Sequence, residues 1–211
     1  MAEVEGIVGN ARNGIGEGVT DVLRIGKTGG LVVGTAHGEH YEAASRGKVW
    51  SACTAVGGVA PGTSLSTTAA FWLHNPIGSG VNLSLIEATM GYLSGTLGAG
   101  SVYLTSHAGA AAVNPTGTAI SPRQTLLGSS ATGLALAFTT ATVVTQIAIR
   151  PVCSFGAILA TTAFQPTQLK DQINGAVIVP PGFGVGLHSI ATAGTAPLAL
   201  FGMLWEEIPI S

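Results

Sequence analysis

The sequence predicts an all-β protein, an antiparallel jelly-roll sandwich with an extended N-terminal arm. Short runs of alternating apolar and small residues recur along the chain, and Gly, Pro and Asn clusters separate them. No apolar stripe of helical period is sustained. Glycine accounts for 31 of the 211 residues, about twice its usual share. Because roughly eight such strands fall in the body of the chain, a jelly roll is the architecture that suits them.

The distribution of charge divides the chain into two regions. Charged residues make up 9% of the sequence, against about 25% in a typical soluble domain. Residues 1–48 hold eleven of them, whereas residues 49–205 hold only Glu87, Arg123, Arg150, Lys170 and Asp171. We therefore expect an extended arm over residues 1–46, which takes its order from neighbouring chains, and a sandwich over residues 47–211. So little charge on the body indicates that other subunits cover part of its surface.

Turn residues delimit the strands of the body. The breaks are Gly57-Gly58, Pro61-Gly62, Asn75-Pro76, Gly78-Ser79-Gly80, Asn114-Pro115, Pro180-Pro181-Gly182 and Ala196-Pro197. Between them we predict strands at Lys48–Val56, Ala69–His74, Val81–Met90, Ser101–Ser106, Gly133–Phe138, Val143–Pro151, Phe155–Thr162, Gly175–Val179, Gly184–Ala191 and Leu198–Glu206. Two shorter β-like pieces, Val22–Ile25 and Leu31–Val33, lie in the arm.

Several classes of partner are disfavoured by composition. A formal net charge of −2 argues against nucleic acid as the main partner. The N-terminus lacks the basic and apolar regions of a secretory signal. Residues 124–149 carry no charge, but Leu134, Leu136 and Phe138 alternate with small residues, which is strand spacing and argues against a membrane-spanning helix. Cys53 and Cys153 lie in apolar alternating runs and are predicted to be buried free thiols, with a disulfide as the alternative.

The sequence contains no motif that predicts a cofactor or a catalytic nucleophile. Gly26-Lys27-Thr28 resembles the end of a phosphate-binding loop, but Asp21 occupies the position of the required earlier glycine. No Gly-x-Ser-x-Gly occurs. His74, His107 and His188 are isolated and are predicted to be structural hydrogen-bonding residues. We therefore predict a protein that is not an enzyme and has no catalytic residue, cofactor or metal ion.

Two alternatives to that prediction remain open. A glycosidase needs two facing carboxylates, and the body offers Glu87, Asp171, Glu206 and Glu207, with no pattern that makes two of them converge. Carboxylates assembled across subunits could still form a hydrolase. The segment His37-Gly38-Glu39-His40 is best interpreted as a solvated arm or interface segment, because its histidines are three residues apart and glycine flanks them. A three-fold axis could nevertheless gather it into a metal site.

The aromatic residues favour core packing over ligand binding. Trp50, Trp72 and Trp205 each lie in an alternating strand, where burial in the core is expected. The segment Asn114–Ser130 is long, polar and rich in Pro and Gly, and recognition sites are often found in loops of this kind. A solvated loop and a glycan-binding loop are both compatible with this composition.

The body resembles a known group of proteins in its motifs. These are Gly47-Lys48-Val49-Trp50-Ser51-Ala52-Cys53-Thr54, Pro61-Gly62-Thr63, Phe71-Trp72-Leu73-His74-Asn75-Pro76, Gly95-Thr96-Leu97-Gly98-Ala99-Gly100, Val179-Pro180-Pro181-Gly182-Phe183-Gly184-Val185 and Leu200-Phe201-Gly202-Met203-Leu204-Trp205-Glu206-Glu207. A Pro-Pro-Gly turn, a Gly-rich strand and a final strand ending in Trp-Glu-Glu resemble the last hairpin of trimeric jelly-roll proteins of tailed-phage virions. Those proteins are similar to the tumour-necrosis-factor and C1q folds. The resemblance covers residues 47–208.

The resemblance implies an assembly role. It implies a homotrimer and a place in the virion, assembled in the host cytoplasm, most readily as a decoration (cement) protein that binds the major capsid protein and stabilises the phage head. A tail-fibre or spike module that recognises a host-surface glycan is the alternative. The arm has no counterpart in the cytokine folds, and its role is argued from physics, since an extended segment can add a strand to a neighbour's sheet. Neither nucleic acid nor membrane is an expected partner.

Overall fold

A computed structural model of the chain describes residues 38–107, 114–144, 146–157 and 168–210. The chain divides into two compact units between Tyr41 and Glu42, and the second unit holds all the strands described below. The β-like pieces predicted in the arm lie outside the described residues, as does His37. A short helix, α1 (Tyr41–Ser45), precedes the first strand, within the segment for which the sequence predicted only an extended arm.

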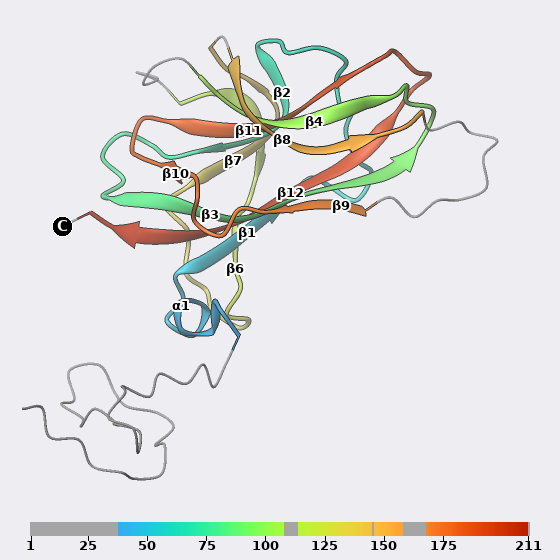
Figure 1. Cartoon of the computed structure of the whole chain (residues 1–211). Helices are drawn as coiled ribbons and strands as arrows, with labels where there is room; N and C mark the ends of the chain where they lie inside the picture. Colours follow the sequence, from blue (N-terminus) through green and yellow to red (C-terminus); the bar gives the residue numbers. More distant parts are fainter. Residues whose placement is uncertain (1–37, 108–113, 145, 158–167, 211) are drawn as a thin grey trace, which may run out of the picture. The chain divides into compact units, whose positions relative to one another are not determined.

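The strands form two antiparallel sheets (Figure 1). The first sheet has the order β10-β3-β12-β1-β6, with β9 also paired to β3, and comprises β1 (Val49–Cys53), β3 (Val81–Ser94), β6 (Arg123–Gln124), β9 (Gln168–Gln172), β10 (Ile178–Val179) and β12 (Leu198–Pro209). The second sheet has the order β5-β7-β2-β11-β4-β8 and comprises β2 (Thr68–His74), β4 (Gly100–His107), β5 (Thr116–Ile120), β7 (Leu136–Thr142), β8 (Gln146–Phe155) and β11 (Gly184–Ala191). The predicted antiparallel β-sandwich is confirmed.

Strand pairing is nested along the chain. The strand β1 pairs with β12, and β2 pairs with β11. Further in, β3 pairs with both β9 and β10, and β4 pairs with β8. Each outer pair therefore encloses the next one in sequence, as if a single long hairpin had been folded over. The strands β5, β6 and β7 are inserted between β4 and β8 and extend the two sheets at one end.

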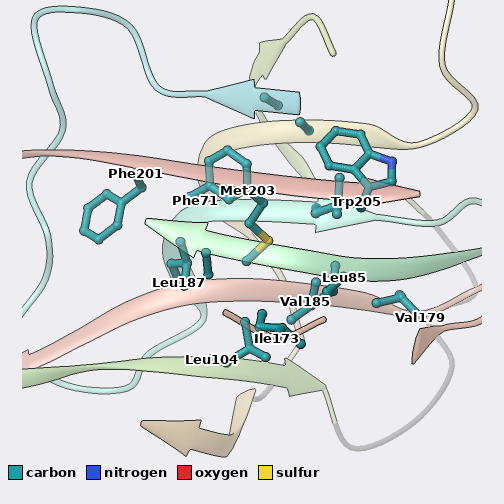
Figure 2. Packing of buried hydrophobic residues seen from close by; sticks show 14 of the residues in the cluster. Phe71, Leu85, Leu104, Ile173, Val179, Val185, Leu187, Phe201, Met203 and Trp205 are labelled. Atoms are coloured by element: carbon teal, nitrogen blue, oxygen red, sulfur yellow. The ribbon is translucent and has the colours of Figure 1, made fainter. Parts of the chain in front are cut away.

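The inner faces of the two sheets share one apolar core (Figure 2). Phe201, Met203 and Trp205 of β12 alternate inward, as the period-2 pattern predicted, and meet Val185 and Leu187 of β11 from the other sheet. Trp50 lies directly across from Trp205 on the neighbouring strand. All three tryptophans are buried, as the sequence predicted, although Trp72 belongs to a separate cluster with Ala69 and Ala141.

Some strand boundaries differ from the predicted ones. The strand β8 starts three residues later than expected and runs through Pro151 to Phe155. Proline is tolerated there because β8 is the edge strand, and the register shifts beside it. The predicted strand Phe155–Thr162 lies largely outside the described residues. Of the predicted strand Gly175–Val179 only Ile178–Val179 forms, because Gly175 has a φ of 80° in a turn.

The prediction of two buried cysteines was wrong. Cys53 is exposed and Cys153 is half-buried, and both are free. The strand β1 buries Ala52 in the core, so the next residue, Cys53, faces the opposite side of the sheet. Cys153 lies on the edge strand β8, where its partial burial raises the pKa of its thiol.

No helix of the described part of the chain has the length and apolar character required to cross a bilayer. The uncharged stretch 124–149 contributes instead to β6, β7 and β8.

Candidate functional site

Four of the five charged residues between positions 49 and 205 gather at the β8–β9 side of the sandwich. Arg150 Nη2 of β8 lies 2.9 Å from Asp171 Oδ1 of β9 and links the two sheets. On β9, Lys170 Nζ lies 3.6 Å from Glu87 Oε2 of β3, and Gln172 Nε2 donates to the same oxygen at 3.0 Å. The charges that the sequence scatters over 85 positions thus have a structural use in holding strands and sheets together.

The carboxylates of this cluster do not face each other. Asp171 lies opposite Ala88, which is fully buried in the core, so Asp171 faces the space between the sheets. Glu87 lies opposite Gln172 and, as the neighbour of Ala88 on β3, faces the other side. Glu207 is buried, and its carboxylate accepts the backbone N–H groups of Leu134 and Ala135. Asp171 and Glu87 therefore do not form the facing pair that a glycosidase uses, and the Glu207 carboxylate is held by backbone N–H groups.

The outer face of the second sheet carries a buried polar layer. His188 Nε2 donates to the Ser64 carbonyl at 2.5 Å, and its Nδ1 accepts from Gln146 Nε2 at 3.4 Å. Gln146 also accepts from Thr105 Oγ1 at 2.6 Å and donates to the Ser66 carbonyl. Burial lowers the pKa of His188, and the bond to Ser64 opposes that change. A neutral imidazole fits this network, which ties the segment 64–66 to the sheet.

His74 lies in the same layer but lacks such partners. It is 1% exposed, and neither ring nitrogen makes a hydrogen bond to a described residue. Burial lowers its pKa, the neighbouring His107 lowers it further, and the Asn114 side chain raises it without reaching hydrogen-bond geometry. His107 stacks between Trp72 and Phe183, with ring centroids 5.7 and 5.3 Å apart.

Two glycines of β11 make room for this layer. A Cβ on Gly184 would lie 2.4 Å from Trp72 Nε1, and one on Gly186 would lie 2.5 Å from Trp72 Cε3. The indole therefore lies directly on the β11 backbone. A cavity of about 280 Å³ adjoins the layer and is bordered by Trp72, both neighbouring histidines and the segments 114–116 and 142–144. None of the described residues that border it is charged.

A second cavity lies in the connection between β6 and β7. It measures about 480 Å³ and is lined by the segments 121–124 and 126–132, so it belongs to the region predicted as a polar loop, Asn114–Ser130. That prediction was partly wrong, because Thr116–Ile120 and Arg123–Gln124 form β5 and β6. These strands lack an alternating apolar pattern and order themselves only by pairing with β7 and β1.

The predicted metal segment is described only in part. Residues 38–40 precede α1, whereas His37 lies outside the described residues. No group of three or more His, Cys, Asp or Glu side chains suited to a metal ion occurs within the part of the chain that the structure describes. His74 and His107, which the sequence treated as isolated, are brought together; their approach depends on β2 and β4 flanking β11.

Comparison of the chain with protein-family models, curated proteins and solved structures gave no match.

Proposed function

We propose that this chain is a non-enzymatic structural protein of a virus particle, a homotrimer whose jelly-roll subunits decorate and stabilise the head of a tailed phage. The observation that carries the proposal is an apolar edge strand, β8, whose single charged residue is paired with Asp171. Its partners would be two further copies of the chain and the major capsid protein, and its location the virion. The nested strand pairing supports a jelly roll, because that architecture joins two antiparallel sheets in this manner.

The edge strand β8 supports self-association. It pairs only with β4 among the described strands, so its other side offers free backbone donors and acceptors. Ile147 and Ile149 are 49% and 45% exposed, and Val144 just before the strand is 53% exposed. Monomeric proteins usually protect such an edge with charged residues, whereas β8 has only Arg150, which is paired with Asp171. Burial against another subunit would remove this apolar edge from water.

The first experiment is the solution mass of the purified chain by light scattering at low micromolar concentration. We expect a stable trimer. Ile147→Lys with Ile149→Lys should reduce the mass towards that of a monomer, because each lysine would have to be buried in the interface. Ile77→Lys is the matched control, since Ile77 is 64% exposed in a turn away from β8. A monomeric native chain would contradict the assembly role.

Capsid binding is tested separately from trimer formation. A chain without residues 1–46 should remain a folded trimer and no longer bind capsids, because the arm is proposed to anchor the body to the shell. Unchanged binding by the truncated trimer would place the anchoring surface in the body.

A glycan-binding tail module is the second candidate function. The cavity in the β6–β7 connection favours it, because small-ligand sites are concave and combine apolar walls with a few polar groups. Specific adsorption of the pure protein to host cells, with no affinity for capsids, would favour this function over decoration.

A further inference from the structure

Arg123 differs from the other charged residues of the body. The four charges at the β8–β9 side neutralise one another in two ion pairs. Arg123 lies on β6, at the opposite end of the first sheet, and its side chain is exposed. It makes no ion pair with any described residue, although 18 charged residues occur in the chain. Among the five charged residues between positions 49 and 205, Arg123 is therefore the one without an ion pair to a described residue.

This unpaired arginine lines the cavity of about 480 Å³ in the β6–β7 connection. None of the described residues that line it carries a carboxylate. Ser121, Ser130 and Thr132 contribute hydroxyl groups that make no hydrogen bond to a described residue, whereas the Gln124 amide is turned to Gly47, whose carbonyl accepts from its Nε2. Leu126 and Leu127 add apolar surface. The cavity thus combines one positive charge, several neutral hydrogen-bonding groups and an apolar wall.

The frame of the cavity is held at both ends. At its start, Arg123 and Gln124 pair with Ser51 and Trp50 of β1, and the Thr125 N–H donates to the Val49 carbonyl at 3.0 Å. At its end, the buried carboxylate of Glu207 accepts the Leu134 and Ala135 N–H groups at 2.9 and 3.0 Å. Within the connection, Ser129 Oγ accepts the Ala131 N–H at 3.1 Å. A site held in this way loses little conformational entropy when a ligand binds.

We propose that this cavity binds a sugar ring that carries a carboxylate. The planar guanidinium of Arg123 can donate two parallel hydrogen bonds to a carboxylate. The sugar hydroxyls match the Ser and Thr hydroxyl groups, and the C–H face of the ring matches Leu126. A single arginine balances the one negative charge of a carboxylate, whereas a phosphate monoester carries about −1.5 to −2 and would call for further cations. The cavity volume falls in the range of small-molecule sites, about 300–1,000 Å³.

This site goes beyond the assembly role, and either can hold without the other. A decoration or fibre subunit with this pocket would present one acidic-sugar site per copy. Three copies would raise the avidity for a polymer of such sugars through effective concentration, without new contacts.

The test is calorimetric titration of the full chain with the methyl glycosides of D-glucuronic acid and N-acetylneuraminic acid, with methyl glucoside as the neutral comparison. At least one acidic sugar should bind, and the neutral sugar should bind at least about 10-fold more weakly, as expected for loss of a charged hydrogen bond. Arg123→Gln should weaken the binding of the acidic sugar by roughly 10- to 100-fold. Lys170→Gln removes the same charge at the opposite end of the sheet and should leave binding unchanged.

Four outcomes would overturn the proposal: no binding of either acid, equal binding of the neutral sugar, an unaffected Arg123→Gln variant, or acetate that binds as tightly as the sugar acids. Because Arg123 is exposed, its replacement should keep the melting temperature and the solution mass. If Arg123→Gln loses sugar binding at an unchanged solution mass, the loss is due to the sugar site and not to disassembly. A monomeric mass of the native chain would instead contradict the proposed trimer.

Discussion

The inner core and the outer layer of the second sheet are buried to the same degree but by different chemistry. Between the sheets, Phe71 and Leu85 are 0% exposed among apolar neighbours, so burial alone stabilises them. On the outer face, His188 and Gln146 are also buried, and their burial is favourable only because they hydrogen-bond to each other and to the segment 64–66. The core is therefore expected to tolerate acid, whereas the outer layer depends on its histidines staying neutral.

The largest expected effect is in the core. Trp205→Ala should lower the free energy of unfolding by about 3–5 kcal/mol, because a large fully buried aromatic side chain is removed and a cavity remains. Denaturant unfolding monitored by circular dichroism measures the change. Ile208→Ala on the same strand is the control, since Ile208 is exposed and should change stability little. An unchanged unfolding midpoint for Trp205→Ala would refute the position of this residue in the core.

The next largest loss of stability is expected at the two glycines of β11 that lie against Trp72. Gly186→Ala should destabilise the body by roughly 1–3 kcal/mol, because the new Cβ would overlap the indole and force it from the β11 backbone. Gly78→Ala is not a suitable control, because its φ of 81° strains any side chain. Gly57→Ala is matched, since nothing lies within 4 Å of its Cβ position. Equal melting temperatures for the Gly186 and Gly57 variants would show that the outer layer repacks freely.

Acidification should destabilise the outer layer of the second sheet and not the apolar core. Burial lowers the pKa of His74 and His188 in the folded chain, whereas the unfolded chain keeps the ordinary value of 6.5. Below that pH the unfolded state binds more protons than the folded state, so stability is full above about pH 6.5 and falls as the pH decreases towards the folded-state pKa values. Melting temperatures between pH 5 and 7 measure the decline.

The variant His74→Phe isolates one of these groups. With this variant the melting temperature should fall less steeply as the pH decreases, because one titrating group is removed. Ile77→Phe, which alters an exposed turn residue that does not titrate, should leave the slope as it is. A melting temperature of the native chain that does not change between pH 5 and 7 would contradict a layer that requires neutral histidines.

The smallest effect is expected at the link between β8 and β9. Arg150→Gln should cost about 1 kcal/mol or less, since the arginine side chain is 38% exposed and partly exposed ion pairs contribute little. Lys170→Gln should cost less still, because its 3.6 Å pair with Glu87 is more exposed. A double-mutant cycle with Asp171→Asn gives the coupling between Arg150 and Asp171. A loss of several kcal/mol would mean that this pair, not the apolar core, holds the sheets together.

Sequence alone determined the fold class and the strands that the core uses. Gly184–Ala191 was predicted with its observed ends, and Trp205 was placed in the core, because a strand with one buried face must alternate apolar residues with others. Gly, Pro and Asn located most of the breaks between strands, because their turn preferences are also local. The strands β5, β6 and β9 escaped prediction, because their small or polar residues are ordered by pairing with distant strands.

Only the tertiary structure decided what lies next to what. It put His74 beside His107, joined Arg150 to Asp171 across two sheets, turned Cys53 outward and placed Arg123 in a cavity without an ion pair to a described residue. Each of these depends on strand order and on which face a residue occupies, and a shift of one residue in register reverses the face. Local sequence patterns report the period of a strand, but the neighbours of a strand are set by packing over the whole chain.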